Sequence, residues 1–231
     1  MIELYSGTPG SGKSLHLARK VRDSLKFCCP VIGTFHINQD MLYKRSKYPY
    51  TYVNIYDLTP KFLLKYYEQN KRYLKHNVEG SFLLVIDECQ RIFNSRTWQE
   101  NKNRNDWITF FAEHRHFGFN VILVSQMDIM IDRQIRGLLE YNYLHRKVDN
   151  FGFGGKLMSF FTGNFVVVKT WYAIKGFNIG SEFIRGNKKL YNFYNTFEDF
   201  ALEGRGEVQE SCPDFQSDYL EKLKKISPLS A

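Results

Sequence analysis

The sequence predicts an α/β protein built on a mostly parallel, doubly wound sheet. Short apolar runs alternate with amphipathic stretches through residue 148, which is the order that strand–helix–strand units produce. A glycine-rich loop separates a strand expected at residues 2–5 from a helix expected at residues 13–26. Another apolar run, at residues 82–86, ends in two adjacent acids. Because parallel strands end at one edge of a sheet, these polar features predict a single site there.

The other elements follow the same alternation. Thr59 before Pro60 predicts the start of a helix, since threonine caps helix N-termini and proline suits the first helical position. The unbroken apolar run of residues 82–86 is typical of a strand covered on both faces. Further strands are expected at residues 31–35, 52–55, 81–87, 119–125 and 141–148, and further helices at residues 60–74, 106–116 and 132–139.

The last third of the chain has a different character. Residues 151–155 are glycine-rich, residues 165–174 alternate and are β-branched, and residues 182–194 mix aromatic and basic side chains. We therefore expect a single domain over residues 1–203, with a core at 1–148 and an antiparallel, β-rich appendage at about 151–203. The polar residues 204–231 are expected to form a mobile tail.

Composition restricts the class of protein. The chain has 231 residues, of which 43% are hydrophobic and 24% charged, as in globular proteins. Its four cysteines show no metal-ligand spacing, so a disulfide scaffold or zinc finger is not expected. The sequence has no secretory signal and no apolar stretch near the roughly 20 residues of a spanning helix. The net charge of +8 suits an anionic partner such as nucleotide, nucleic acid or anionic lipid.

Residues 7–14, GTPGSGKS, match the phosphate-binding (Walker A) pattern G-x-x-x-x-G-K-[ST] without a mismatch. Glycines let backbone amides turn toward phosphate oxygens, and the following helix presents its positive end to the same anion. Lys13 would neutralise the β and γ phosphates of ATP, and Ser14 would bind Mg²⁺. The alternative is a chance glycine-rich turn. The predicted nucleotide-binding residues are Gly7, Thr8, Pro9, Gly10, Ser11, Gly12, Lys13, Ser14 and Leu15.

Three polar side chains end the neighbouring apolar strands. Asp87 is predicted to hold the Mg²⁺ shell, and Glu88 to polarise the attacking water, as in a Walker B motif. Gln126 ends the strand at 119–125, where an amide could sense the γ phosphate. The alternative for each is a polar cap on an exposed strand end.

The arginines and histidines outside these motifs give weaker evidence of function. An arginine from a neighbouring subunit often stabilises charge on the transferring phosphoryl group, and the candidates are Arg96, Arg115, Arg133 and Arg136. Any of them could instead be a solvated or structural arginine. His114 and His116 flank Arg115 at the end of a predicted helix, where cations suit the helix dipole, so we interpret this segment as structural.

These motifs together resemble the zonula occludens toxin (Zot) family, whose members include the assembly ATPases of filamentous bacteriophages. The resemblance covers most of residues 1–200. Besides the phosphate loop, it rests on the segments VIDECQ at 85–90, EHRHFG at 113–118 and VILVSQ at 121–126.

The resemblance implies a P-loop fold of the additional-strand class with a catalytic glutamate. It implies a ring-forming oligomer, such as a hexamer, that hydrolyses ATP to extrude single-stranded phage DNA with its coat through the host envelope. Lys13 and Ser14 would bind nucleotide and Mg²⁺, Asp87 the metal shell, Glu88 the water, and Gln126 would act as sensor. Familiar members also carry a transmembrane helix after the ATPase region, and this chain reaches Ala231 without one. A cytoplasmic protein is therefore expected, which meets the inner membrane through a coat or membrane partner.

Two other functions remain open from the residues alone. A small-molecule kinase shares the phosphate loop and the chain length. An ATP-gated DNA-binding or scaffold protein would use a basic surface and turn over little ATP. The basic residues considered for that surface are Lys44, Arg45, Lys47, Lys71, Arg72, Lys75, Lys102 and Arg104.

Overall fold

The computed structural model describes residues 1–38, 46–148, 164–174 and 177–193, all within one compact unit, Met1–Asp199. The predicted glycine-rich segment at 151–155 and the tail at 204–231 lie outside the described residues, so the proposed domain limits stay a prediction. The strands are β1 Ile2–Ser6, β2 Val31–Gly33, β3 Tyr50–Tyr52, β4 Phe82–Ile86, β5 Phe119–Ser125, β6 Tyr141–Lys147, β7 Phe165–Trp171 and β8 Asn178–Ile184.

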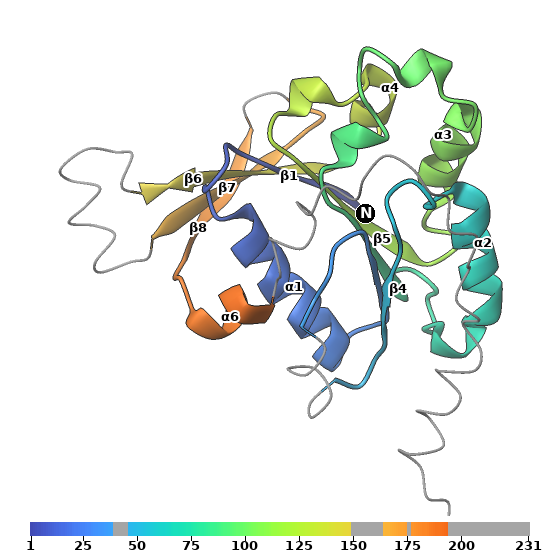
Figure 1. Ribbon diagram of the computed structural model, residues 1–231, viewed down its shortest axis with the longest axis horizontal. Coiled ribbons are helices and arrows are strands. Elements are labelled where there is room, and N and C mark those ends of the chain that lie inside the picture. Colours follow the sequence, from blue (N-terminus) through green and yellow to red (C-terminus); the bar gives the residue numbers. More distant parts are fainter. Residues whose placement is uncertain (39–45, 149–163, 175–176, 194–231) are drawn as a thin grey trace, which may run out of the picture. The chain divides into compact units, whose positions relative to one another are not determined.

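These strands form one sheet in the order β3-β2-β4-β5-β1-β6-β7-β8 (Figure 1). Neighbours from β3 to β6 pair in parallel, whereas β6, β7 and β8 pair antiparallel. The predicted α/β fold with an antiparallel extension is therefore confirmed. In addition, β5 lies between β1 and β4, which is the inserted strand that the additional-strand class requires.

Helices cover both faces of the sheet. On one face α1 and α6 lie together, and on the other α2, α3 and α4 pack against the central strands (Figure 1). The helices are α1 Lys13–Phe27, α2 Pro60–Gln69, α3 Arg104–Glu113, α4 Arg133–Arg136 and α6 Lys188–Phe193, with 3₁₀ turns η2 Lys71–Tyr73, η3 Cys89–Arg91, η4 Trp98–Glu100 and η5 Asp128–Met130. No helix among the described residues is long and apolar enough to cross a membrane.

Strand residues alternate between the two cores. In β4, Leu84 and Ile86 face the core beneath α2 and α3, while Leu83 and Val85 face the core beneath α1. All five residues of β4 are buried, as its continuous apolar sequence predicts. The central strands are therefore held from both sides, and their carboxyl ends stand on a rigid base.

Local polar groups change two predicted boundaries. The strand expected at residues 52–55 is wrong, because β3 ends at Tyr52 and a turn follows. The side chain of Asn54 accepts from the amide of Tyr56 at 3.0 Å, which favours a turn over further pairing. The helix expected to reach residue 74 ends at Gln69, where Asn70 donates its side-chain amide to the carbonyl of Tyr66 at 2.9 Å.

The segment at 182–194 is also mixed rather than purely β. Residues up to Ile184 continue β8, and Lys188–Phe193 form α6. Leu190 and Phe193 of α6 join the core beneath α1. The described part of this segment therefore adds a helix to the α1 face.

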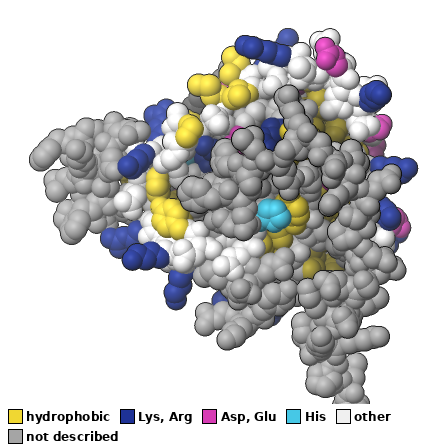
Figure 2. Space-filling view, in the orientation of Figure 1, with side chains coloured by type: hydrophobic (Ala, Val, Ile, Leu, Met, Phe, Trp, Pro, Cys, Tyr) yellow, Lys and Arg dark blue, Asp and Glu magenta, His cyan; other side chains and the backbone are white. Residues whose placement is uncertain are grey.

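Positive charge gathers on the side of the chain that carries β6 to α6. Residues 141–193 contain eight Lys and Arg against two Asp and Glu. Figure 2 shows Lys and Arg side chains interspersed with hydrophobic ones over that side. Trp171, Phe177 and Phe183 are exposed there. Among the described residues, the segment from β6 to α6 therefore carries a net positive charge.

A stability test follows from the aromatic cluster between η3 and α3. The ring of Phe93 is fully buried and lies 5.1 to 5.5 Å from the rings of Trp98, Trp107 and Phe111. We expect Phe93→Ala to lower the free energy of unfolding by about 3–5 kcal/mol, because it leaves a cavity that this rigid cluster cannot fill. Urea unfolding measures the loss. Phe27→Ala, at a 63% exposed position, is the control and should change stability by less than about 0.5 kcal/mol.

Candidate active site: the phosphate loop and the acids of β4

The phosphate loop lies between β1, which ends at Ser6, and α1, which begins at Lys13. Gly7, Gly10 and Gly12 have φ angles of +143°, +73° and +96°, a region that residues with a side chain rarely adopt. No side chain caps the start of α1, so its first amides remain available to an anion. This is the geometry of a phosphate cradle.

Two of these glycines are also required by close packing. A Cβ atom on Gly7 would lie 2.5 Å from the carbonyl oxygen of His145 in β6, and one on Gly12 would lie 2.6 Å from Cγ of Phe165 in β7. Both distances are too short for real carbon contacts. The antiparallel extension therefore supports the loop directly, and His145 and Phe165 are site residues that the sequence did not reveal.

Lys13 is folded back into the loop. Its Nζ donates to the carbonyl oxygens of Gly7 at 2.6 Å and Thr8 at 3.1 Å. Burial lowers the pKa of Lys13, while Glu88 and Asp87 act to raise it. The lysine therefore lies within electrostatic range of both acids, and phosphate oxygens can replace the two carbonyls as its partners.

The acids of β4 are fixed by their own backbone. The amide of Asp87 donates to Oγ1 of Thr34 at 2.9 Å, and the amide of Glu88 donates to Oδ1 of Asp87 at 2.9 Å. Glu88 has a φ of +47°, which is uncommon for a residue with a side chain. This left-handed conformation lies between the end of β4 and the start of η3.

Gln90 is a further residue that sequence reasoning missed. Its Nε2 donates to a carboxylate oxygen of Glu88, and its own Oε1 is buried without a hydrogen-bond partner among the described residues. Glu88 is thus restrained by a neighbour in η3. An amide two residues after the acid pair was the only available signal in the sequence.

Gln126 comes to the same place through β5. Ser125 pairs with Ser6 in the parallel ladder, and the backbone carbonyl of Gln126 accepts from the amide of Gly7 at 3.2 Å. The side chain is half-buried. The structure therefore brings together the loop, Asp87, Glu88 and Gln126, although β5 separates β4 from β1.

The candidate arginines differ in their surroundings. Arg115 is bound by Glu140 at 2.8 Å and by Glu79 at 3.5 Å. Arg136 lies beside Tyr172, where its charge and hydrogen bond lower the pKa of a hydroxyl that burial raises. Arg96 and Arg133 are exposed. Arg115 is therefore committed to its own fold, and the identity of any trans-acting arginine stays a prediction.

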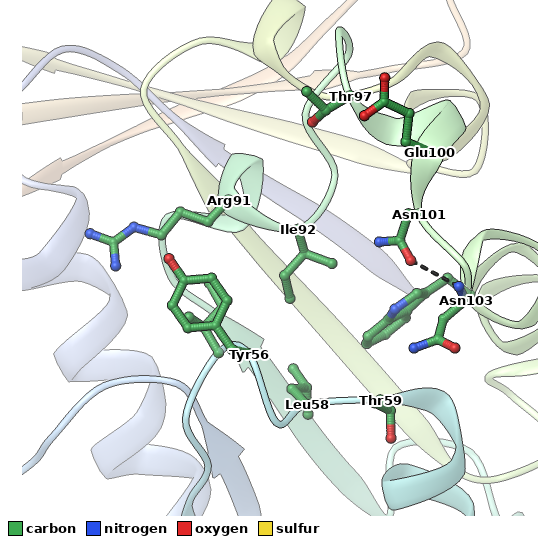
Figure 3. Close-up of a pocket in the computed structure, with 11 residues that line it drawn as sticks. Tyr56, Leu58, Thr59, Arg91, Ile92, Thr97, Glu100, Asn101 and Asn103 are labelled. Carbon is green, nitrogen blue, oxygen red and sulfur yellow. Dashed lines mark hydrogen bonds between the residues drawn. The ribbon is translucent and has the colours of Figure 1, made fainter. Parts of the chain in front are cut away.

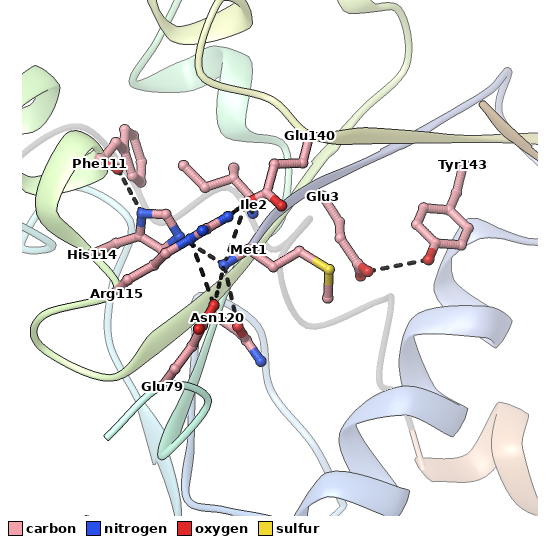
Figure 4. Close-up of polar contacts among 10 residues, drawn as sticks. All are labelled: Met1, Ile2, Glu3, Glu79, Phe111, His114, Arg115, Asn120, Glu140 and Tyr143. Atoms are coloured by element: carbon pink, nitrogen blue, oxygen red, sulfur yellow. Dashed lines mark hydrogen bonds and ion pairs between the residues drawn. The ribbon is translucent and has the colours of Figure 1, made fainter. Parts of the chain in front are cut away.

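His114 belongs to the same structural cluster as Arg115 (Figure 4). Its Nδ1 donates to the carbonyl of Phe111 at 2.6 Å, and its Nε2 accepts from the amino group of Met1 at 2.8 Å. Burial and the Met1 ammonium lower its pKa. His114 therefore contacts the last turn of α3, as expected, but as a neutral imidazole rather than a cation.

Magnesium fits the oxygen groups available at the loop. Among the described residues no cluster of three or more His, Cys, Asp or Glu could hold a metal. Mg²⁺ does not need such a cluster, because it keeps several waters and takes few protein ligands beside substrate phosphates. The hydroxyl of Ser14 and the carboxylate of Asp87 are the groups that would complete its shell.

A hollow of about 350 Å³ is lined by residues of η3, η4 and the segment before α2 (Figure 3). Figure 3 shows Tyr56 and Arg91 at one end and Thr97 and Glu100 at another. None of its lining residues belongs to the loop or to the acid pair. The lining residues are Ile55, Tyr56, Leu58, Thr59, Arg91, Ile92, Thr97, Glu100, Asn101, Asn103 and Trp107.

Two buried histidines lie directly behind the loop. His145 is 1% exposed and His16 is 8% exposed. The Nδ1 of His145 donates to the carbonyl of Ser6 at 3.1 Å, and the Nε2 of His145 lies 2.9 Å from the Nδ1 of His16. Burial lowers the pKa of His16 to about 3 and that of His145 to about 4. Both rings are therefore neutral at physiological pH.

The loop, the inserted strand β5 and the acids that end β4 together define a P-loop ATPase of the additional-strand class. Residues 1–179 match the Zonular occludens toxin (Zot) family. The chain belongs to that family, and the resemblance seen in its motifs is confirmed.

Individual relatives agree with this assignment. The gene 1 protein of Enterobacteria phage f1 is 30% identical over 216 residues, covering 87% of this chain and 60% of that protein. The gene 1 protein of Salmonella phage IKe is 27% identical over 140 residues, covering 56% and 38%. This chain thus spans about 60% of the length of the f1 relative.

Solved structures are also similar. One solved ATPase domain superposes with a TM-score of 0.54 at 11% identity, covering 84% of each chain, so it shares the fold. The N-terminal domain of zonular occludens toxin from Neisseria meningitidis is 19% identical, covers 84% of this chain and 98% of that chain, and gives a TM-score of 0.48.

The histidine pair predicts a pH-dependent stability. The folded-state pKa values lie below the ordinary 6.5, so the unfolded chain binds more protons as the pH falls below about 6.5. The contribution of the pair to the free energy of unfolding should be fully present above about pH 6.5. It should decrease as the pH falls toward the folded-state pKa values of the two histidines. We expect a loss on the order of 1–2 kcal/mol per histidine at about pH 5, measured by urea unfolding. A His16→Phe/His145→Phe double variant should show a weaker pH dependence, and equal dependence in both proteins would contradict the prediction.

Proposed function

We propose that this chain binds ATP with Mg²⁺ at the phosphate loop and hydrolyses it to drive filamentous phage assembly. The observation that carries the proposal is the glycine loop with positive φ angles between β1 and α1, in a sheet whose strand β4 ends directly before Asp87 and Glu88. Membership of the Zot family and similarity to phage gene 1 proteins supply the biological setting.

Each residue has a distinct role in the proposed reaction. Lys13 exchanges its two carbonyl partners for β- and γ-phosphate oxygens, and the loop amides bind the remaining charge. Mg²⁺, when bound through Ser14 and Asp87, neutralises charge that develops on the phosphates. Glu88 accepts a proton as a water oxygen bonds to the γ phosphorus, and the bond to the bridging oxygen of ADP breaks. Gln126 contacts the γ phosphate or the water.

Gln90 restrains the carboxylate that is assigned as the base. In the present arrangement one carboxylate oxygen of Glu88 accepts from the side-chain amide of Gln90, and this contact fixes the orientation of the group. This contact favours slow turnover by the isolated chain and faster turnover when nucleotide or a partner draws Glu88 away. It is also the observation that favours the second candidate, an ATP-gated switch with little hydrolysis.

Assembly and partners follow from the family resemblance. We propose a homo-oligomeric ring in the host bacterial cytoplasm, at the inner face of the membrane, with coat or membrane assembly proteins as partners and single-stranded DNA as cargo. The basic, aromatic side that carries β6 to α6 suits an anionic strand. Of the basic residues first considered, Lys44 and Arg45 lie outside the described residues, Lys71 and Arg72 lie in η2, and Arg104 starts α3.

Two substitutions separate binding from chemistry. Lys13→Ala should weaken ATP binding at least about tenfold, since it removes the phosphate-facing cation. Glu88→Gln should bind ATP almost normally and lose on the order of 10²-fold or more in kcat, because an amide cannot accept the proton. Equilibrium nucleotide binding and phosphate release measure the two effects. Lys20→Ala and Glu113→Gln, both exposed, are matched controls. Normal hydrolysis by Glu88→Gln would show that the assigned base is wrong.

Nucleotide-dependent assembly tests the motor. We expect size-exclusion chromatography with light scattering to show a larger particle with Mg²⁺ and a nonhydrolysable ATP analogue than without nucleotide, because an arginine supplied by a neighbouring subunit would contact the bound phosphates. Lys13→Ala is the control and should not respond to nucleotide. A chain that stays monomeric while transferring phosphate rapidly to a small molecule would contradict the proposal.

A further inference from the structure

We propose that His16 and His145 are positioning residues for the phosphate loop, which clamp its two flanks together against β6. The inference rests on nucleotide binding at this loop, as proposed above. Ser6 immediately precedes the loop, and His16 lies in the first turns of α1 that follow it. His145 contacts both, although it is 129 residues from His16 in the chain.

The hydrogen bonds determine where the protons are. The carbonyl oxygen of Ser6 can only accept, so the Nδ1 of His145 carries a proton and donates at 3.1 Å. The Nε2 of neutral His145 must then accept from the Nδ1 of His16 at 2.9 Å. Both imidazoles are therefore protonated on Nδ1, and the chain of donors points from α1 through β6 to the loop.

Packing holds the clamp in this arrangement. The ring of Tyr5 stacks on the ring of His16, with centroids 4.7 Å apart and planes 16° apart. Tyr143 meets the edge of His16 from β6 at 5.9 Å. Gly7 approaches the backbone of His145 so closely that no Cβ fits between them. Rotating either imidazole would open a buried gap, so the pair fixes the spacing between the end of β1 and the start of α1.

Burial is the main reason that the pair is neutral, and nearby cations add to it. Burial lowers the pKa of both rings; the charge of Lys13 lowers that of His145 further, and the charges of Arg19 and Lys20 lower that of His16 further. A proton added to the Nε2 of His145 would meet the N–H of His16 head on. The clamp therefore contributes directed hydrogen bonds rather than charge.

Glu182 of β8 lies next to His16, at the end of the row of hydrogen bonds that is farther from Ser6. Its Oε1 lies 3.4 Å from the Nε2 of His16, which in the neutral pair presents a lone pair. Two acceptors then face each other, so Glu182, with a side chain 54% exposed, adds no hydrogen bond to the neutral clamp. A glutamine in its place could donate an N–H to His16 and complete the chain from β8 to Ser6.

The function of the clamp follows from what the loop must do. Backbone amides bind phosphate only if successive residues keep their inward turn, and spreading the loop's flanks would rotate them away. Removing the nitrogens of either histidine while keeping an aromatic ring should leave the core filled and release the flanks. His16→Phe retains the stack on Tyr5, so loss of nucleotide affinity would report on the hydrogen bonds.

The test compares the dissociation constant for Mg²⁺-ATP in the wild-type chain with those of His16→Phe, His145→Phe and Glu182→Gln, with melting temperatures measured without nucleotide. We expect each histidine variant to bind about tenfold more weakly, equivalent to about 1.4 kcal/mol. Glu182→Gln should melt at a higher temperature and bind at least as tightly as wild type. Nitrogen-15 NMR of the wild-type chain should show both histidines protonated on Nδ1.

His114→Phe is the matched control, since it removes a buried, hydrogen-bonded imidazole that does not touch the loop; it should lower stability and leave affinity unchanged. Histidine variants that melt lower yet bind within twofold of wild type would overturn the clamp and leave the proposed function intact. If His145→Phe does not fold, the affinities of His16→Phe and Glu182→Gln still test whether the histidine pair positions the loop. Absence of ATP binding by the wild-type chain would overturn the proposed function, and the clamp with it.

Discussion

The contact between the phosphate loop and strands β6 and β7 is the constraint on which the site depends. Gly7 lies against the backbone of His145, and Gly12 lies against the ring of Phe165, with no room for a side chain at either place. A loop that binds phosphate through its amides needs positive φ angles, and these are stable only when the flanking elements cannot move apart. The antiparallel extension supplies that support, so it belongs to the active site as much as the parallel core does.

Strand order then decides which groups meet the loop. Because β5 is inserted between β1 and β4, Gln126 reaches the loop through a neighbouring backbone, while Asp87 and Glu88 approach from one strand further away. The charges of both acids act on Lys13 and oppose the effect of its burial. In this way the site holds a lysine and two carboxylates close together before nucleotide arrives, with Gln90 restraining the carboxylate assigned to catalysis.

Neutral and charged groups are separated along the sheet. Behind the loop, two uncharged imidazoles bind each other and a backbone carbonyl, which costs less than burying ions in the same place. Around the first residue of β1, His114, Arg115 and Glu140 form a partly exposed polar cluster with the chain's amino group (Figure 4). His114 and Arg115 thus stabilise the fold around the start of β1.

The sequence by itself determined the features that depend on neighbours in the chain. The loop pattern, the acids after an unbroken apolar run and the strand–helix alternation are local, and the structure places them as predicted. Several element ends differ from the prediction, and at Asn54 and Asn70 the cause is a single side chain that competes with the backbone. Only the tertiary structure decided that Thr34 holds Asp87, that Phe165 lies under Gly12, and that His16 meets His145. These contacts join residues 53 to 153 positions apart, and hydrophobic periodicity carries no information on which distant strands become neighbours, since a buried strand has the same apolar sequence beside any partner.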